Sequence, residues 1–273
     1  MKRLMLKKKL IFRTVLVMVL LIGAHVCRYF LLYDPFKTDM QNASQAPSFS
    51  HWFGTDNLGR DIFSRVLQGS QTSLYTAICV VVIVFVTGTV LGITAGYLGG
   101  AVDAVIMKII VIFQAFPSFI LAVAVAGMLG AGLVNGMISL CAVYWTTYAK
   151  LARSLVLQIK DATYIRAAKL CGAGKHHIIF RYVLPNVVSS LVVTAAMDVG
   201  SVILSMAGLS FLGLGAQRPT AEWGVMMNEA RNYMQTAPWI ILFPGMALFL
   251  SVILFNLLGD SIRDVLDERA ERK

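Results

Sequence analysis

The sequence predicts an all-α integral membrane protein with six transmembrane helices, and two observations support this prediction. The 273 residues are 58% hydrophobic and only 14% charged, so a soluble domain of this length could not cover its surface with polar groups. Six apolar tracts are also long enough to cross a bilayer. These tracts cover residues 10–32, 74–97, 109–129, 133–150, 187–209 and 238–258.

The first tract follows a basic head, as the core of a signal peptide does. At roughly 20 residues it is long for such a core, and no small-x-small cleavage site ends it cleanly. We therefore expect a retained span. With six spans, both termini lie on the same side of the membrane.

Lysine and arginine residues set the orientation of the spans. With the N-terminus inside, eighteen of the twenty-four lie in inner segments, so the positive-inside rule places both termini in the cytoplasm and the chain in the cytoplasmic membrane. The chain then divides into residues 1–73, with the first span and an outer segment, a transmembrane core over 74–258, and a tail over 259–273. The six basic residues outside are Arg28, Lys37, Arg60, Arg65, Arg218 and Arg231.

Other site classes find little support in the composition. The net charge of +10 marks the cytoplasmic side rather than a nucleic-acid surface, because no aromatic-basic recognition module accompanies it. The cysteines lack the pairwise spacing of metal ligands and argue for neither disulfides nor zinc. We assign no metal site and no catalytic residue. The four cysteines are Cys27, Cys79, Cys141 and Cys171.

The outer segment over residues 33–73 ends in a cluster of turn-forming and charged residues. Arg60 and Asp61, followed by Ser64 and Arg65, can form ion pairs that fix the start of the second span. A calcium loop is disfavoured, because the 12-residue ligand periodicity is missing. The residues with expected structural roles are Gly54, Asp56, Gly59, Arg60 and Asp61.

Two features of the spans predict how they pack. Gly88, Gly92 and Gly96 recur at four-residue intervals in the second tract, which aligns small residues on one face and lets another helix approach closely. Pro117 lies in the third tract, where it should kink or break the helix. Such a break can line a protein-filled or water-filled space, or it can be a kink that faces lipid.

The fifth tract contains one acidic residue, Asp198, near its middle. A charge at bilayer depth costs about 2.5–3.5 kcal/mol on insertion scales, so it should face a partner or an aqueous path. We place Asp198 and Ser201 on a candidate translocation path, where a carboxylate favours a cationic or amine-bearing solute. The alternative is a structural hydrogen bond to Ser201, to Thr194 or to a partner subunit.

The loop before the last tract mixes Gly, Trp, Glu and Arg, so we expect it to be folded. With Glu222 and Trp223, it could cover the outer mouth and receive a delivering protein.

Residues 161–186 form a basic island between two apolar tracts. We expect two short helices at an angle, because Gly172 and Gly174 permit a sharp turn. The second helix should end near Leu184, since the residue before Pro185 is pushed out of the α region. This island is either a cytoplasmic docking loop or an ordinary solvated basic loop.

Together these landmarks resemble the permease subunits of binding-protein-dependent ABC importers of the peptide/nickel group, specifically the second of the two permeases. Residues 161–186 are similar to the EAA loop of that family, because Ala167-Ala168, Gly172 and Leu184-Pro185-Asn186 match it in order and spacing. The other matching landmarks are Gly54-Thr55-Asp56 with Gly59-Arg60-Asp61 and Ser64-Arg65, Ala95-Gly96-Tyr97 with Gly99-Gly100, and Phe211-Leu212-Gly213-Leu214-Gly215 with Trp223-Gly224.

The resemblance implies a type I permease fold and a set of partners. A sister permease completes a heterodimer, an extracytoplasmic solute-binding protein delivers cargo, and two cytoplasmic ATPases use ATP and Mg²⁺. This chain itself binds no cofactor. Arg166 stands where the name of the loop expects Glu, which puts in doubt only the salt bridge that an acid would make. The implied ATPase-coupling residues are Tyr164, Arg166, Ala167, Ala168, Gly172, Gly174, Leu184 and Pro185.

The resemblance favours nickel or a chelated metal as cargo, with di- or oligopeptides as the alternative. Asp198 is compatible with a metal cation or a positively charged chelate. The chain has no phosphate-binding loop, so ATP hydrolysis must belong to another subunit. The competing class is an ion-gradient-driven secondary transporter with Asp198 as its ion site, for which the sequence offers no convincing inverted repeat.

Overall fold

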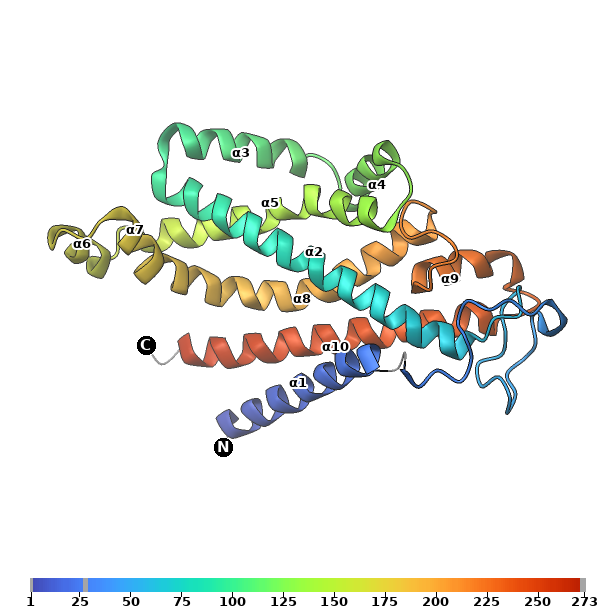
Figure 1. The fold of residues 1–273 in the computed structure, drawn as a ribbon. Helices are drawn as coiled ribbons and strands as arrows, with labels where there is room; N and C mark the ends of the chain where they lie inside the picture. The colour runs from blue at the N-terminus through green and yellow to red at the C-terminus, as the bar shows by residue number, and fades with distance from the viewer. Residues whose placement is uncertain (1, 27–28, 271–273) are drawn as a thin grey trace.

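The computed structural model describes residues 2–26 and 29–270, and this part of the chain is helical, without a β-strand. The long helices run broadly along one axis of an elongated molecule (Figure 1). Two short helices, α6 (Thr163–Leu170) and α7 (Lys175–Ile178), lie at one end. The segment over residues 29–61 and α9 (Trp223–Ala230) lie at the opposite end.

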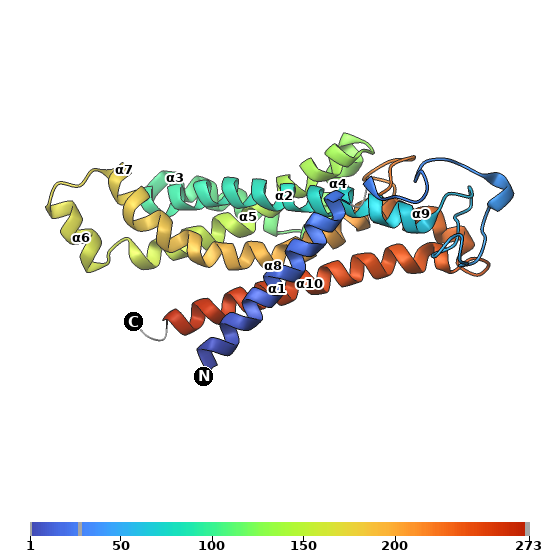
Figure 2. The ribbon, with the colours of Figure 1, turned by 60° about the horizontal axis from the view of Figure 1, so that its bottom comes forward.

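Four helical segments in the described residues are long and apolar enough to cross a membrane. They are Met5–Val26 within α1 (Lys2–Val26), α2 (Ile62–Leu98), Lys175–Phe211, which joins α7 to α8 (Leu184–Phe211), and Trp239–Leu266 within α10 (Trp239–Ala270). Figure 2 shows α1 crossing alongside α10. The described residues therefore contain several membrane spans. Length and hydropathy identify four helices rather than the six that the sequence predicts.

The first two predicted spans have different bounds in the structure. The first helix starts at Lys2 and its described part ends at Val26; residues 27 and 28, with Cys27 and Arg28, lie outside the described residues. The second helix begins at Ile62 instead of residue 74. Hydropathy missed this early start because the first three turns carry buried polar residues.

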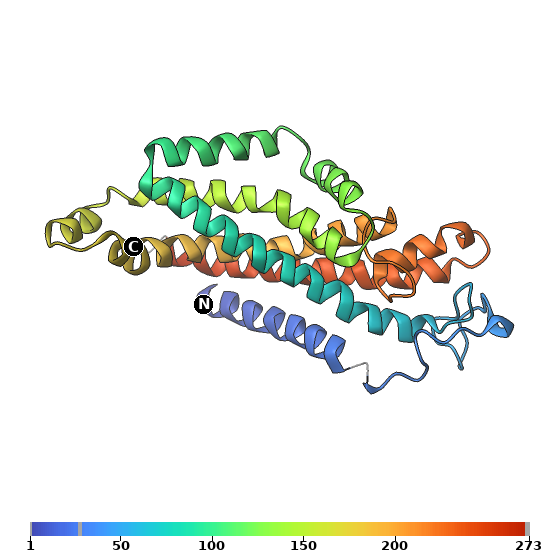
Figure 3. The same cartoon turned by 45° about the horizontal axis from the view of Figure 1, so that its top comes forward.

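The predicted third span, residues 109–129, is not one continuous helix. The chain forms α3 (Gly100–Gln114) and α4 (Ser118–Leu129), which meet at an angle of 89°. Pro117 directly precedes α4 and cannot donate a backbone hydrogen bond into α3. The sequence therefore predicted the break at the right residue, but not its size. Figure 3 shows the bend from above.

The predicted fourth span corresponds to α5 (Leu133–Ile159), which starts at the expected residue and continues beyond residue 150. This helix is not among the apolar candidates, because polar residues such as Thr146 and Lys150 interrupt it. It packs instead against α2, α4 and α8. Its most buried residues, including Leu140 and Ala152, belong to the hydrophobic core of the molecule.

Three glycines of α2, spaced four residues apart, lie against α5 and leave no room for a side chain. A Cβ on Gly88 would lie 2.6 Å from the carbonyl oxygen of Trp145, and one on Gly92 would lie 2.6 Å from the Cβ of Ala152. A Cβ on Gly96 would lie 2.8 Å from the Cβ of Val156. The absence of side chains thus lets the two backbones approach closely, which is how helices in lipid gain van der Waals contact.

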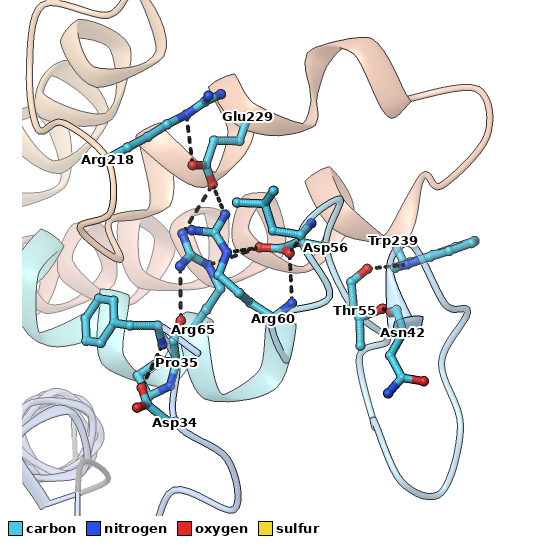
Figure 4. A network of polar contacts seen from close by, with 12 residues as sticks. Asp34, Pro35, Asn42, Thr55, Asp56, Arg60, Arg65, Arg218, Glu229 and Trp239 are labelled. Carbon is cyan, nitrogen blue, oxygen red and sulfur yellow. Dashed lines mark hydrogen bonds and ion pairs between the residues drawn. The ribbon is translucent and has the colours of Figure 1, made fainter. Parts of the chain in front are cut away.

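A buried ionic cluster joins the segment over residues 29–61 to α2 and α9 (Figure 4). Arg60 donates to Asp56 at 2.6 Å and to Glu229 at 2.7 Å. Arg65 also reaches Glu229, at 3.2 Å, and donates to the carbonyl of Pro35 at 3.1 Å. The side chains of the two acids and two arginines are at most 4% exposed.

The expected ion pairs at the start of the second span therefore form with different partners. Asp61 does not pair with Arg60 but accepts the backbone N–H of Ser64 at 2.7 Å and caps α2, while its other oxygen lies 2.9 Å from His51. Gly59 has a φ of +75°, and a side chain there would collide with the backbone of Asp39. The result is a folded segment rather than a loose loop.

This segment is also fastened to the start of α10. Trp239 donates from its indole nitrogen to the carbonyl of Thr55 at 3.2 Å (Figure 4). The ring of Phe53 stacks on that of Phe243 with a centroid distance of 4.0 Å. Residues 29–61 thus hold the adjacent ends of α2, α9 and α10 together.

We predict that Gly92→Ala destabilises the folded protein by roughly 1–3 kcal/mol, because the added methyl group overpacks the contact between α2 and α5. The measurement is the thermal unfolding midpoint of the purified protein in detergent. Gly127→Ala is the matched control, since Gly127 lies within α4 with no atom within 4 Å of an added Cβ. Equal midpoints for the two variants would contradict the close-contact argument.

We predict that Arg65→Ala costs about 3–5 kcal/mol of stability, because the two buried acids, Asp56 and Glu229, are then left with a single buried arginine, Arg60. Arg218 pairs with the same Glu229 at 3.0 Å but is 66% exposed, so Arg218→Ala should cost at most about 1 kcal/mol. Thermal midpoints and the folded fraction recovered by size-exclusion chromatography compare the two. A loss of similar size in both variants would show that burial does not control this cluster.

Candidate translocation path and coupling segment

The predicted docking segment forms a helix-turn-helix at one end of the molecule. Helix α6 and helix α7 are separated by a turn in which Gly172 has a φ of +82°, a value that favours glycine. Gly174, by contrast, has an ordinary φ of −68° and precedes α7. Of the two turn glycines, only Gly172 is required by its backbone conformation.

The coupling residues predicted from the sequence lie mostly on the surface of this segment. Tyr164 is 45% exposed, and Arg166, Ala167 and Pro185 are also exposed, whereas Ala168 and Leu184 are half-buried. Two side chains outside that set, Leu170 at 89% and Phe180 at 66%, are more exposed than Tyr164. Ile165 and Ile178 are buried and anchor the two short helices.

The expected end of the second short helix near Leu184 is wrong. After α7 the chain makes a π-helical turn over Ile179–Val183 and continues directly into α8. Pro185 lies in the first turn of α8, where a missing N–H is tolerated. The side-chain amide of Asn186 donates to the carbonyl of Tyr182 at 2.6 Å. The wider π turn thus lets the helix pass through the proline.

Asp198 lies on α8 and forms a hydrogen bond that the sequence did not predict. The hydroxyl of Tyr148 on α5 donates to its Oδ2 at 2.7 Å. Ser201, the other predicted path residue, is exposed on α8, and its carbonyl accepts from Ser205 at 2.8 Å. The oxygen of Ser205 lies 2.9 Å from that of Tyr144, one turn from Tyr148. A polar seam, defined as Tyr144, Tyr148, Asp198, Ser201 and Ser205, therefore runs between α5 and α8.

Glu222 and Trp223 start α9 and are each only 1% exposed. The carboxylate of Glu222 accepts the backbone N–H groups of Gly224 and Val225, both at 3.0 Å, and the hydroxyl of Ser73 on α2 at 3.1 Å. Burial raises the pKa of the Glu222 carboxyl above its ordinary value, and these hydrogen bonds oppose the rise. Both side chains thus fasten α9 to α2 and do not form the surface of an open loop.

Sequence reasoning missed several residues of these sites. Tyr144 and Tyr148 are four residues apart in the fourth predicted tract, a spacing that places both on one helix face and could have indicated the seam. Glu229 gave no such signal, because its partner Arg65 is 164 residues away. Within residues 2–26 and 29–270, no group of three or more His, Cys, Asp or Glu side chains is placed to hold a metal ion.

Comparisons with known proteins agree with this architecture. Residues 88–272 match the family described as binding-protein-dependent transport system inner membrane component. The fold of the inward-facing MetNI methionine ABC transporter matches with a TM-score of 0.62 at 19% identity, over 75% of this chain and 97% of the other. That likeness concerns the fold alone.

Relatives in sequence carry three different cargo names. The chain is 41% identical to the nickel transport system permease protein NikC of Escherichia coli strain K12, over 93% of this chain and 91% of that protein. It is 46% identical to the glutathione transport system permease protein GsiD of Escherichia coli O6:K15:H31, over 93% and 84%. It is 42% identical to the dipeptide transport system permease protein DppC of Alkalihalophilus pseudofirmus, over 85% and 77%.

Such permeases are transport components and not enzymes, because the ATPase of an ABC importer is a separate subunit. The helical fold, the multiple apolar spans and these matches lead to one assignment. The chain belongs to the family of binding-protein-dependent transport system inner membrane components, as a permease subunit of the peptide/nickel group of ABC importers.

Proposed function

We propose that this chain is one of two different permease subunits in an ATP-driven importer of nickel or a chelated metal. Its termini and the α6–α7 segment lie in the cytoplasm, and the bent pair α3–α4 and α5 complete a set of six spans. Two ATPases bind on the cytoplasmic side and a solute-binding protein delivers cargo outside. The main observation behind this proposal is the exposed α6–α7 segment. It continues without interruption into α8, the helix that carries Asp198.

The exposure of apolar side chains on α6 and on the π turn after α7 supports a docking role. Leu170 and Phe180 are largely exposed on a segment that also carries Arg166, Lys169 and Lys175 at its surface. Large apolar side chains beside exposed charges, at the end of a molecule, are typical of a surface that a protein partner covers. An ordinary solvated loop would not need them.

The orientation follows from charge. The basic residues gather around the N-terminus, residues 150–181 and the C-terminal tail. The start of α1, the α6–α7 segment and the end of α10 lie in the same half of the molecule in Figure 1. The positive-inside rule places that half in the cytoplasm, where the ATPases are.

The preference for a metal cargo rests on a carboxylate within the spans and on one relative. Asp198 offers a negative charge on the polar seam, and the similarity to a nickel permease extends over most of the chain. A peptide cargo is the second candidate, because the dipeptide and glutathione permeases are 42% and 46% identical to this chain, compared with 41% for the nickel permease. An amino terminus would use the same carboxylate. Mass spectrometry of the solute retained by the cognate binding protein distinguishes the two.

We predict that Gly172→Val abolishes ATP-dependent uptake while the protein remains in the membrane. A β-branched residue at a φ of +82° adds strain of about 1–3 kcal/mol, which would weaken docking by roughly 5- to 150-fold. Uptake and co-purification of the ATPases are measured in the assembled transporter.

Gly100→Val is the matched control for this experiment. Gly100 also has a positive φ, of +55°, with no atom near its missing Cβ, but it is the first residue of α3 and does not lie in the docking segment. It should keep the ATPases bound. Normal uptake by the Gly172 variant would count against a coupling role for α6 and α7.

A further inference from the structure

We propose that Tyr148 is a positioning residue that turns one oxygen of Asp198 toward the cargo, and that this oxygen binds a cationic group of the cargo. The inference rests on the proposed function and deepens it, because it assigns to a pair of residues the preference for a cationic solute. Tyr148 belongs to α5 and Asp198 to α8, so the site requires both helices.

Packing fixes the position of the Tyr148 side chain independently of its hydrogen bond to Asp198. Its side chain is 1% exposed, and its ring lies edge-on to Phe85 with a centroid distance of 6.1 Å. Its Cβ also lies directly against Gly88 of α2, where a side chain would collide with it. A hydroxyl held in this way can fix the orientation of its acceptor, since few rotamers remain open to it.

Asp198 uses only one of its oxygens within the described residues. Oδ2 accepts from Tyr148, whereas no described residue donates to Oδ1, and Oδ1 is not among the buried atoms without a partner. Thr194 and Ser201, the neighbours that a purely structural role would use, make no hydrogen bond to the carboxylate in this structure. A half-buried Asp198 therefore presents an accessible oxygen beside the exposed Ser201.

Lipid is an unsuitable neighbour for that oxygen. A carboxylate within a span is stable only against a partner or water, and the seam continues the polar surface through Ser201 and Ser205. The described chain places no basic side chain within ion-pair distance of Asp198. A cation from outside the chain would therefore supply the missing ion-pair partner of Asp198.

The test measures uptake kinetics of the full transporter, with sister permease, ATPases and binding protein, in proteoliposomes. The probes are radiolabelled Ni²⁺, dialanine and glutathione, and the probe that the wild type takes up on ATP addition is used for all variants. Asp198→Asn should raise KM about tenfold or more and Tyr148→Phe roughly 3- to 10-fold, with kcat little changed, as expected for a lost charge contact and a lost hydrogen bond.

The double variant should have the KM of Asp198→Asn alone, because a positioning residue has no effect once the group that it positions is absent. Tyr75→Phe is the control, since its hydroxyl also bonds across helices, to Leu21 at 3.3 Å, but lies away from the seam. It should keep the wild-type KM and the same amount of folded protein.

Three outcomes would overturn the inference. Unchanged KM in both single variants, with wild-type uptake intact, would remove the cargo contact and leave the proposed function standing. Additive effects, or losses in kcat and folded protein with KM unchanged, would reduce Tyr148 and Asp198 to a structural pair. No ATP-driven uptake of any of the three probes by the wild-type transporter would overturn the proposed cargo classes, and this inference with them.

Discussion

The close approach of α2 and α5 is the constraint on which the polar seam depends. Because Gly88 has no side chain, the backbone of α2 meets Tyr148 directly and the tyrosine ring is buried between the two helices. The Tyr148 hydroxyl then points toward α8, where it donates to Asp198. Any larger residue at Gly88 would push α5 outward and move this hydroxyl with it, since packed helices transmit such shifts.

The opposite end of the molecule is held by charge instead of close packing. Asp56 and Glu229 are matched by Arg60 and Arg65, so the buried part of the cluster is neutral, and Arg218 reaches it from the surface. Burying four charges is costly unless each finds its partners. The cluster therefore links α9 to residues 29–61, because Glu229 on α9 reaches Arg60 only when both parts are in place.

The sequence predicted those features that depend on local rules and missed those that depend on distant partners. Apolar length and the proline rule identified most spans and the break at Pro117, and glycine spacing identified the face of α2 that meets another helix. The early start of α2 escaped hydropathy, because Arg65 and Ser70 are polar and yet buried. The pairing of Tyr148 with Asp198, fifty residues apart, required the fold itself.

The proline rule also failed once, at Pro185, and the reason matters for the proposed coupling. A helix that ended at Leu184 would separate α6 and α7 from the span, whereas the π turn over Ile179–Val183 keeps Lys175–Phe211 one continuous helix. A displacement of α6 and α7 by an ATPase would then tilt α8 as a lever. Asp198 would move with α8, while Tyr148 would stay with α5 and α2. Such a tilt would therefore separate the two side chains and break the hydrogen bond between them. The Asp198 carboxylate would thus have a different orientation in the two positions of α8. Its affinity for a cationic cargo would differ accordingly.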